Sequence, residues 1–278
     1  ATKGLHSDST SAEYTDATVM NAFNSDGFTV VSHAISNASS ATYVAWNWKA
    51  GGTAASNSDG SITSSVSAGE YMSICTWTGD GNSGATIGHG LGKVPSMILV
   101  KRRNTNNGWT VYHEALGTGS EMYLNMTQAV TSSNFWLTSP TTSVFSVSSS
   151  DYVNASGDTY VGYVFANLEG ACKAGSYVGN GNTDGTFVYT GFRPAWIMQK
   201  KSNNTGHWHI WDSTRNTSNE VTRYLLANET NAEYTDGGLD ILSNGFKPRK
   251  TGTGLNASGD TYIYLAFADQ PFKFSNAR

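Results

Sequence analysis

The stretch Asn154-Ala-Ser-Gly-Asp-Thr-Tyr160, with the apolar run Val161-Gly-Tyr-Val-Phe-Ala166 behind it, decides the fold because the chain repeats it. It returns as Asn256–Tyr262 before Ile263–Ala268, and in looser form as Asn37–Tyr43 before Val44–Trp48. Successive copies lie 117 and 102 residues apart, whereas solenoid units run to roughly 20–50 residues. The spacing predicts a small domain copied in tandem. It favours a modular binding or structural protein over one with a single buried active site.

We call the repeated seven residues, Asn154–Tyr160 and its two copies, the phrase. The rest of the repeat can be aligned outward from it. Tyr177–Asn182 repeats Trp77–Asn82, Pro194–Lys201 repeats Pro95–Arg102, and Trp208–Trp211 repeats Trp109–Tyr112. These matches predict one unit over residues 70–170 and a second over residues 171–278.

The first 52 residues match only the back half of a unit. Ala12–Asp16 recurs as Ala232–Asp236, and Ser25–Phe28 recurs as Ser243–Phe246. A half domain exposes its core and unpaired strand edges. We therefore expect residues 1–52 to cover their apolar face against the next domain or another chain. Either the chain is a C-terminal piece of a longer protein, or its first strands pair with another copy. No secretory signal opens the sequence.

Residues 53–69 are polar and small, so they are predicted to be a linker.

Composition indicates an all-β protein. Charged residues make up 14% of the chain, against roughly 25% in an average domain, and Gly, Ser, Thr and Asn take their place. Short β-branched and aromatic runs are bounded by turn residues, and no long window has helical spacing. We predict tandem antiparallel β-sandwich units of jelly-roll-like form.

Charge and hydropathy exclude two classes of partner. The net charge of −4 and pI near 5.8 give no electrostatic case for nucleic acid. No apolar stretch approaches the roughly 20 residues of a membrane helix, so membrane insertion is not expected. Cys75 and Cys172 fall at non-equivalent places in the two units, with Cys75 aligned to Gly175. Two free thiols are predicted.

Several longer motifs resemble a known family. They are Tyr43–Gly52, Asn57–Ser67, Thr78–Gly81, Gly88–Pro95, Phe187–Pro194 and the ending Pro271–Arg278. Together they resemble a repeat module of tail-fibre and related virion proteins from phages of marine bacteria and cyanobacteria. The resemblance implies a virion location and a role in particle structure or host attachment. It also implies assembly with other virion proteins and a homo-oligomer, with a trimer favoured. It carries no catalytic motif to transfer.

Aromatic and basic residues recur together in the two complete units. The set comprises Lys101, Arg102, Trp109 and Tyr112, with their counterparts Lys200, Lys201, Trp208 and Trp211. Aromatic faces bind sugar rings and neighbouring polar groups orient them. The alternatives are a sandwich core, since β sequences enrich aromatics anyway, or a subunit interface. Trp208 and Trp211 have opposite parity on one strand, so one is expected to face outward.

Other candidate chemistry is weaker. His207 and His209 have metal-pair spacing, but no third ligand motif lies near them. Asn180–Gly185 imitates the start of a calcium loop, yet position 12 is Gly191. No Gly-x-Ser-x-Gly nucleophile elbow occurs. We therefore expect no metal, no cofactor and no enzymatic activity. The Asn-Ala-Ser phrases match glycosylation acceptors, but their fixed place before a strand favours an Asx-type turn.

The sequence thus predicts a tail-fibre-like virion protein that binds a host-surface receptor, most naturally a glycan, through many weak contacts. Two alternatives stay open. One is a capsid decoration or fibre-shaft module with no ligand, and the other is a depolymerase of surface polysaccharide.

Overall fold

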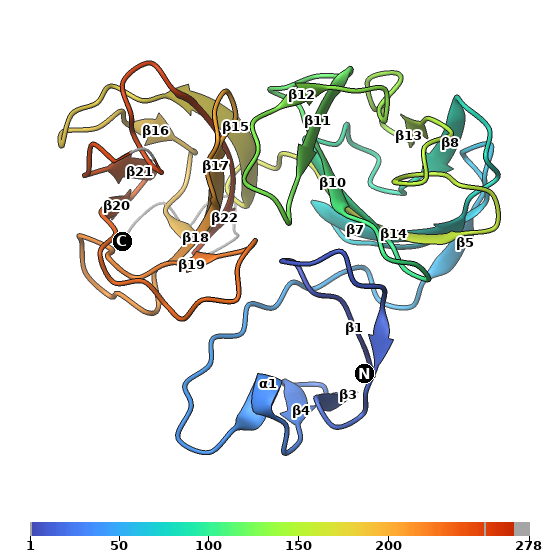
Figure 1. Cartoon of the computed structure of the whole chain (residues 1–278), viewed down its shortest axis with the longest axis horizontal. Coiled ribbons are helices and arrows are strands. Elements are labelled where there is room, and N and C mark those ends of the chain that lie inside the picture. Colours follow the sequence, from blue (N-terminus) through green and yellow to red (C-terminus); the bar gives the residue numbers. More distant parts are fainter. Residues whose placement is uncertain (1, 253, 270–278) are drawn as a thin grey trace.

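The computed structural model describes residues 2–252 and 254–269, so the ending Pro271–Arg278 that contributed to the family resemblance lies outside the described residues. The described residues are nearly all β, as predicted, with 39% strand and 1% helix. Two sandwiches stand side by side, and an N-terminal arm, residues 2–52, lies against both (Figure 1).

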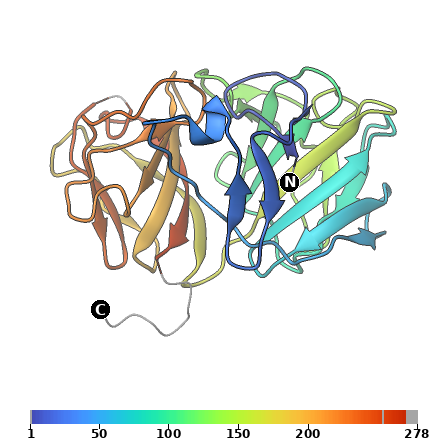
Figure 2. The same cartoon turned by 90° about the horizontal axis from the view of Figure 1, so that it is seen from below.

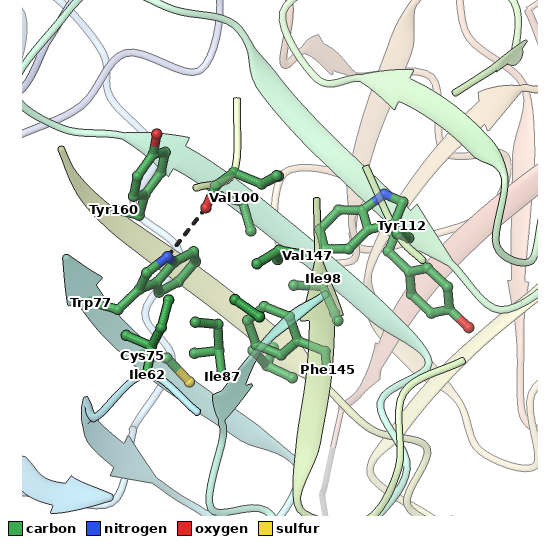
Figure 3. Close-up of a cluster of buried hydrophobic side chains, with 14 of the residues drawn as sticks. Ile62, Cys75, Trp77, Ile87, Ile98, Val100, Tyr112, Phe145, Val147 and Tyr160 are labelled. Carbon is green, nitrogen blue, oxygen red and sulfur yellow. Dashed lines mark hydrogen bonds between the residues drawn. The ribbon is translucent and has the colours of Figure 1, made fainter. Parts of the chain in front are cut away.

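The first sandwich is built on an eight-stranded antiparallel sheet. Its strands in spatial order are β12 (Thr131–Ser132), β11 (Ser120–Tyr123), β10 (Trp109–His113), β9 (Met97–Arg102), β14 (Thr159–Phe165), β7 (Met72–Thr78), β6 (Ser64–Ala68) and β5 (Ala55–Asn57). A small sheet of β8 (Ala85–Gly88) and β13 (Val144–Val147) covers one face. The core between these layers gathers Trp77, Phe145 and Tyr160 among aliphatic side chains (Figure 3).

The second sandwich repeats this plan. Its larger sheet runs β15 (Cys172–Val178), β22 (Thr261–Ala268), β17 (Pro194–Lys201), β18 (Trp208–Asp212) and β19 (Leu225–Leu226). Its smaller sheet is β16 (Val188–Tyr189), β21 (Gly245–Pro248) and β20 (Leu239–Leu242). β22 lies between β15 and β17, just as β14 lies between β7 and β9. The strands that follow the repeated phrase are therefore equivalent, which confirms the prediction of duplication.

Each sandwich core contains an equivalent trio of aromatic side chains. Trp77 stacks on Tyr160 and meets Phe145 edge-on. In the second sandwich, Tyr177 stacks on Tyr262 and meets Phe246 edge-on.

The two sandwiches pack against each other through a shared core. The face of each large sheet that points away from its own small sheet packs against the other sandwich, forming a third core that includes Met97, Trp109, Trp196, Trp208 and Phe267. The two sandwiches together thus have four sheet layers and three cores among the described residues. Neither large sheet offers a broad exposed face between the two sandwiches.

The predicted linker over residues 53–69 is wrong. β5 and β6 pair with each other, and β6 pairs with β7, so this segment extends the large sheet. Ile62, Ser64 and Val66 are buried while their neighbours Ser61, Thr63 and Ser65 are exposed. This alternation is the period of a half-buried strand, and the surrounding serines conceal it in the sequence.

The arm has the architecture of a half unit. β1 (Lys3–Gly4) pairs with β2 (Tyr14–Thr15), and the hairpin of β3 (Met20–Phe23) and β4 (Phe28–Val30) corresponds to β20–β21. A single-turn helix, α1 (Ala34–Asn37), follows. Tyr14 pairs with Gly4 as Tyr234 bridges Tyr224, so the predicted equivalence of the two tyrosines is confirmed.

The segment Val44–Trp48, which the repeat predicts to be the last strand of the arm, does not form one. Residues 44–50 alternate between half-buried and exposed but are not assigned to a strand, because the partners that flank β22 have no counterpart in the arm. Trp46 and Trp48 instead pack at the seam between the sandwiches, where Trp48 meets Trp196 and Phe267. The arm crosses this seam in Figure 2. The prediction that it covers an apolar face on the next domain is confirmed for this segment.

The repeated phrase has a common hydrogen-bonding role. Its tyrosine hydroxyl accepts a hydrogen bond from the alanine amide five residues earlier, at 2.7 Å for Tyr43, 2.8 Å for Tyr160 and 3.0 Å for Tyr262. The phrase therefore closes a loop before its strand, as a tyrosine corner does in other sandwiches.

The phrase asparagines also serve the fold. Asn154 and Asn256 are fully buried. The amide group of Asn154 donates to Asp80 and Asn82, and that of Asn256 donates to Asn180 and Asn182. This burial supports the turn interpretation over glycan attachment.

Candidate functional site

All but one of the eight candidate residues are buried. Their exposed fractions are 5% or less, except at Arg102, which is half-buried. Lys101 and Trp109 lie where the arm meets the first sandwich. Lys200 and Trp208 lie where the first sandwich meets the second.

The joint between the arm and the first sandwich consists of a loop seated on the β9–β10 hairpin. The Trp109 indole donates to the His6 carbonyl at 2.8 Å. The Thr10 carbonyl accepts from the Asn107 amide at 2.8 Å and from Lys101 Nζ at 3.3 Å. The Glu13 amide donates to the Arg103 carbonyl at 2.7 Å. We call this the arm joint.

The joint between the two sandwiches repeats it with equivalent atoms. The Trp208 indole donates to the Tyr123 carbonyl at 2.8 Å. The Thr127 carbonyl accepts from the Gly206 amide at 2.8 Å and from Lys200 Nζ at 3.0 Å. The Val130 amide donates to the Ser202 carbonyl at 2.8 Å. We call this the sandwich joint.

The numbering shows that this correspondence follows the repeat. Tyr123, Thr127 and Val130 each lie 117 residues after His6, Thr10 and Glu13, which is the spacing between the first two copies of the phrase. A lysine and a tryptophan of each complete unit therefore bind the loop of the unit before it. This is a subunit-like contact within one chain.

The second basic residue of each pair binds the repeated phrase. Arg102 forms ion pairs with Asp158 and, at 3.3 Å, with Asp151. Lys201 Nζ lies 3.0 Å from Asp260. Asp158 and Asp260 occupy the same place in the phrase. Arg102 and Lys201 thus hold the turn before the last strand of each unit.

Tyr112 and Trp211 belong to the sandwich cores. Tyr112 packs in the first core and Trp211 in the second, whereas Trp208 packs between the sandwiches. The opposite parity of Trp208 and Trp211 is confirmed. The expectation that one of them faces outward is wrong, because the neighbouring sandwich covers the second face of the sheet.

Burial changes the acid–base properties of both joint lysines. It lowers the pKa of Lys101 to about 8, with a smaller contribution from Arg102. It lowers the pKa of Lys200 to about 8, with a smaller contribution from Lys201. Both ammonium groups are directed at backbone carbonyls, which compensates part of the cost of burying a charge. Each lysine therefore serves a joint between units. Of the eight residues, Trp211 also lines the cleft described next.

An open cleft of about 160 Å³ lies instead on the second sandwich. His209, Trp211, Tyr224, Asp236 and Lys250 are among its lining residues. The Tyr224 hydroxyl donates to Asp236 at 3.2 Å, and burial, with the nearby Asp236 charge, raises the pKa of Tyr224 to about 12. The volume is below the roughly 300–1,000 Å³ of most ligand pockets, so the cleft has room for a small group only.

The arm has a related cleft of about 420 Å³. It is lined by Tyr14, Asp16 and His33, among others, and Asp16 is the counterpart of Asp236. The repeated Ala-Glu-Tyr-Thr-Asp segment is the sequence signal for both clefts, because its aspartate lines each of them, as Asp16 in the arm and Asp236 in the second sandwich.

An apolar cavity of about 320 Å³ lies between the sandwiches. Trp46, Trp48, Trp109, Trp196 and Phe267 are among the residues that line it. No charged side chain contributes to its wall. Its lining is continuous with the core between the sandwiches.

Metal-ligand chemistry is sparse in the described ranges. Within residues 2–252 and 254–269, no cluster of three or more His, Cys, Asp or Glu residues could hold a metal ion. His207 pairs with Glu229, while His209 is buried against Trp211 and Tyr224. The two thiols are free, as predicted. Across those same ranges, no helix has the length and apolar character to cross a membrane.

Comparison with known families gives one assignment. A family described as a domain of unknown function, DUF7483, matches residues 1–271. The chain belongs to this family. The match takes in the arm and both sandwiches, in keeping with their shared cores. No curated protein and no solved structure matches the chain.

Proposed function

We propose that the chain is a non-enzymatic structural protein of a phage particle, tail-fibre-like in its organisation. The observation that carries this proposal is the repeated joint, in which each unit seats its loop on the Lys–Trp hairpin of the next. Such joints fix one unit against another, as a shaft or an adhesin stalk requires. The sequence resemblance to virion modules supplies the setting.

The virion role is tested by localisation. Antibodies against the chain should label intact particles of the phage that encodes it in electron micrographs, and its peptides should copurify with particles through density gradients. Absence from purified particles, with the protein present in infected cells, would reject the virion role.

We further propose that the cleft at Tyr224 and Asp236 makes weak contacts with host glycans. The observation that favours it is an aromatic surface beside a carboxylate and an ammonium, the combination that binds and orients sugar rings. Copies of the chain on one particle would multiply weak affinities into firm attachment.

The glycan contact is tested with Lys250→Ala and Asp236→Asn on a glycan array and in host-cell adsorption. Lys173→Ala, on an edge strand away from the cleft, is the matched control. Loss of binding in the cleft variants alone supports adhesion. If the wild type binds no glycan on any array but assembles onto particles, a shaft or decoration module without a ligand is favoured. Released oligosaccharide would favour a depolymerase instead.

A further inference from the structure

The third loop of the repeat is free. The residues of the second sandwich that correspond to His6, Thr10 and Glu13 of the arm are Leu226, Thr230 and Glu233. Within the described residues, the Thr230 carbonyl and the Glu233 amide have no hydrogen-bond partner. The same two groups are bonded to a hairpin in both joints. The loop Leu226–Asp236 therefore has the bonding groups of a joint and no hairpin seated on it.

This free loop is nearly identical to the arm segment that occupies the first hairpin. Thr230-Asn-Ala-Glu-Tyr-Thr-Asp236 differs from Thr10-Ser-Ala-Glu-Tyr-Thr-Asp16 only at Asn231 and Ser11. The local contacts agree as well. Lys3 pairs with Glu13, and Arg223, its counterpart, pairs with Glu233. Glu233 also pairs with Arg215 at 2.7 Å, a contact within the second sandwich that has no counterpart in the arm.

Charge identifies the hairpin that fits. In the arm joint, Glu13 forms an ion pair with Arg103 at 2.7 Å. In the sandwich joint, the corresponding residues are Val130 and Ser202, and neither is charged. The free loop carries Glu233, so it matches the hairpin with Arg103 and not the hairpin with Ser202.

The occupant of that hairpin can be displaced. Among the described arm residues, 2–52, none is fully buried. Segments with few buried contacts open at low free-energy cost. The arm competes for the hairpin as a tethered segment, with an effective concentration in the millimolar range for a short flexible linker.

We propose that the loop Leu226–Asp236 is an assembly surface that binds the β9–β10 hairpin, Met97–His113, of a second copy of this chain. The loop takes the place of that copy's arm and repeats the arm joint between molecules. Thr230 accepts from Lys101 and Asn107 of the second copy, and Glu233 pairs with its Arg103. The contact joins two different surfaces, so copies add head to tail and form a closed ring or an open filament. This inference does not depend on the virion role.

The test opens the arm and leaves both sandwiches intact. Glu13→Arg removes the ion pair with Arg103 and sets two positive charges together, so the hairpin is released. By sedimentation equilibrium, E13R should self-associate at least about tenfold more tightly than wild type, because the tethered competitor is gone. Asp26→Arg makes the same charge change on an exposed turn of the arm and is the matched control. D26R should behave as wild type.

Two further measurements separate this contact from non-specific association. Adding Glu233→Arg to E13R sets that loop against Arg103 and should return the chain to its 29.7 kDa monomer. Because the change also breaks the ion pairs of Glu233 with Arg215 and Arg223, urea denaturation of E233R alone checks that the second sandwich stays folded. In the E13R assembly, hydrogen exchange should slow at the Glu233 amide, which is unpaired in the single chain. The proposal is overturned if E13R stays as monomeric as D26R, if E13R/E233R associates as strongly as E13R, or if the Glu233 amide gains no protection.

Discussion

Trp208 and Trp211 lie three residues apart on β18 and face opposite sides of one sheet, yet both are buried. Trp211 fills the core of its own sandwich, and Trp208 fills the core that this sandwich shares with its neighbour. A strand with aromatics on both faces therefore needs a layer on each side. The second layer is supplied by another copy of the same unit, and this explains why the repeats act as one body.

Replacing the two joint tryptophans by Phe should have different effects on the protein. Trp208→Phe leaves the Tyr123 carbonyl without its indole donor between the sandwiches, so the free energy of unfolding should fall by about 1–3 kcal/mol. Trp109→Phe removes the same bond to His6, which lies in the arm. Its main effect should be faster hydrogen exchange over residues 2–16. Urea denaturation followed by exchange mass spectrometry checks both, and equal protection of the arm in W109F and wild type would contradict the arm joint.

The joint lysines give the stability a pH dependence. Burial lowers the pKa of Lys200 to about 8 from an ordinary 10.5. Between these values the unfolded chain binds more protons than the folded one, so this lysine makes stability rise with pH. The slope is at most about 1.4 kcal/mol per pH unit for one lysine.

The measurement is the difference between wild type and Lys200→Met in urea denaturation at pH 7 to 10. Cys75 and Cys172, whose raised pKa values lower stability above pH 9, contribute equally to both proteins and cancel. The advantage of K200M over wild type should shrink as pH rises from 8 to 10. A constant difference would show that the ammonium carries no cost in the joint.

The phrase asparagines should be structural in both units. Asn256→Ala removes two donated hydrogen bonds and one accepted from the Asn180 amide, all within a fully buried site. The expected loss is about 1–3 kcal/mol, with a similar loss for Asn154→Ala. Asn37→Ala is the matched control because the turn that Asn154 and Asn256 bind has no counterpart in the arm. A loss for N37A equal to that for N256A would refute this role of the phrase.

The sequence predicted the repeat, the fold class and the equivalent strands because those depend on local patterns that the units share. It misassigned residues 53–69, where Ile62 and Val66 are the only large apolar side chains in a serine-rich hairpin. It named the candidate residues for ligand or interface contact without showing what they contact. Lys101, Trp109, Lys200 and Trp208 recur for a reason that one unit cannot reveal, since each binds the loop of a different unit. The sequence pattern of one unit does not contain its contacts with the next unit. These contacts become apparent only when the bonded residues of the two joints are compared and are found at equivalent places in the repeat.

The β3–β4 hairpin of the arm should tolerate a polar substitution that the corresponding β20–β21 hairpin of the second sandwich does not. Phe23 is 73% exposed, whereas Ile241, its counterpart in the second sandwich, is 4% exposed. Phe23→Ser should change the free energy of unfolding by no more than about 0.5 kcal/mol, and Ile241→Ser should lower it by about 3 kcal/mol or more. Thermal and urea denaturation compare the two. A loss in F23S close to that in I241S would mean that the arm's apolar face is covered in solution.

The last prediction concerns one cross-strand pair of residues. In the two units the glycine of this pair lies on opposite strands. In the first sandwich Cys75 lies opposite Gly162, and in the second Gly175 lies opposite Tyr264. A Cβ on Gly175 would meet the Tyr264 hydroxyl at 2.7 Å, so a side chain there requires the ring to move. Each unit thus has room for one side chain in this place and puts it on a different strand.

Gly175→Cys should therefore destabilise wild type, typically by about 1–3 kcal/mol as other overpacked cores do. In a Tyr264→Gly background the same change should stabilise the chain, because it restores the Cys and Gly pair of the first sandwich and fills part of the space left by the ring. The coupling free energy of this double-mutant cycle should reach about 0.5–3 kcal/mol. Urea denaturation of the four proteins measures it. An equal penalty for G175C in both backgrounds would show that the two sites do not share one space.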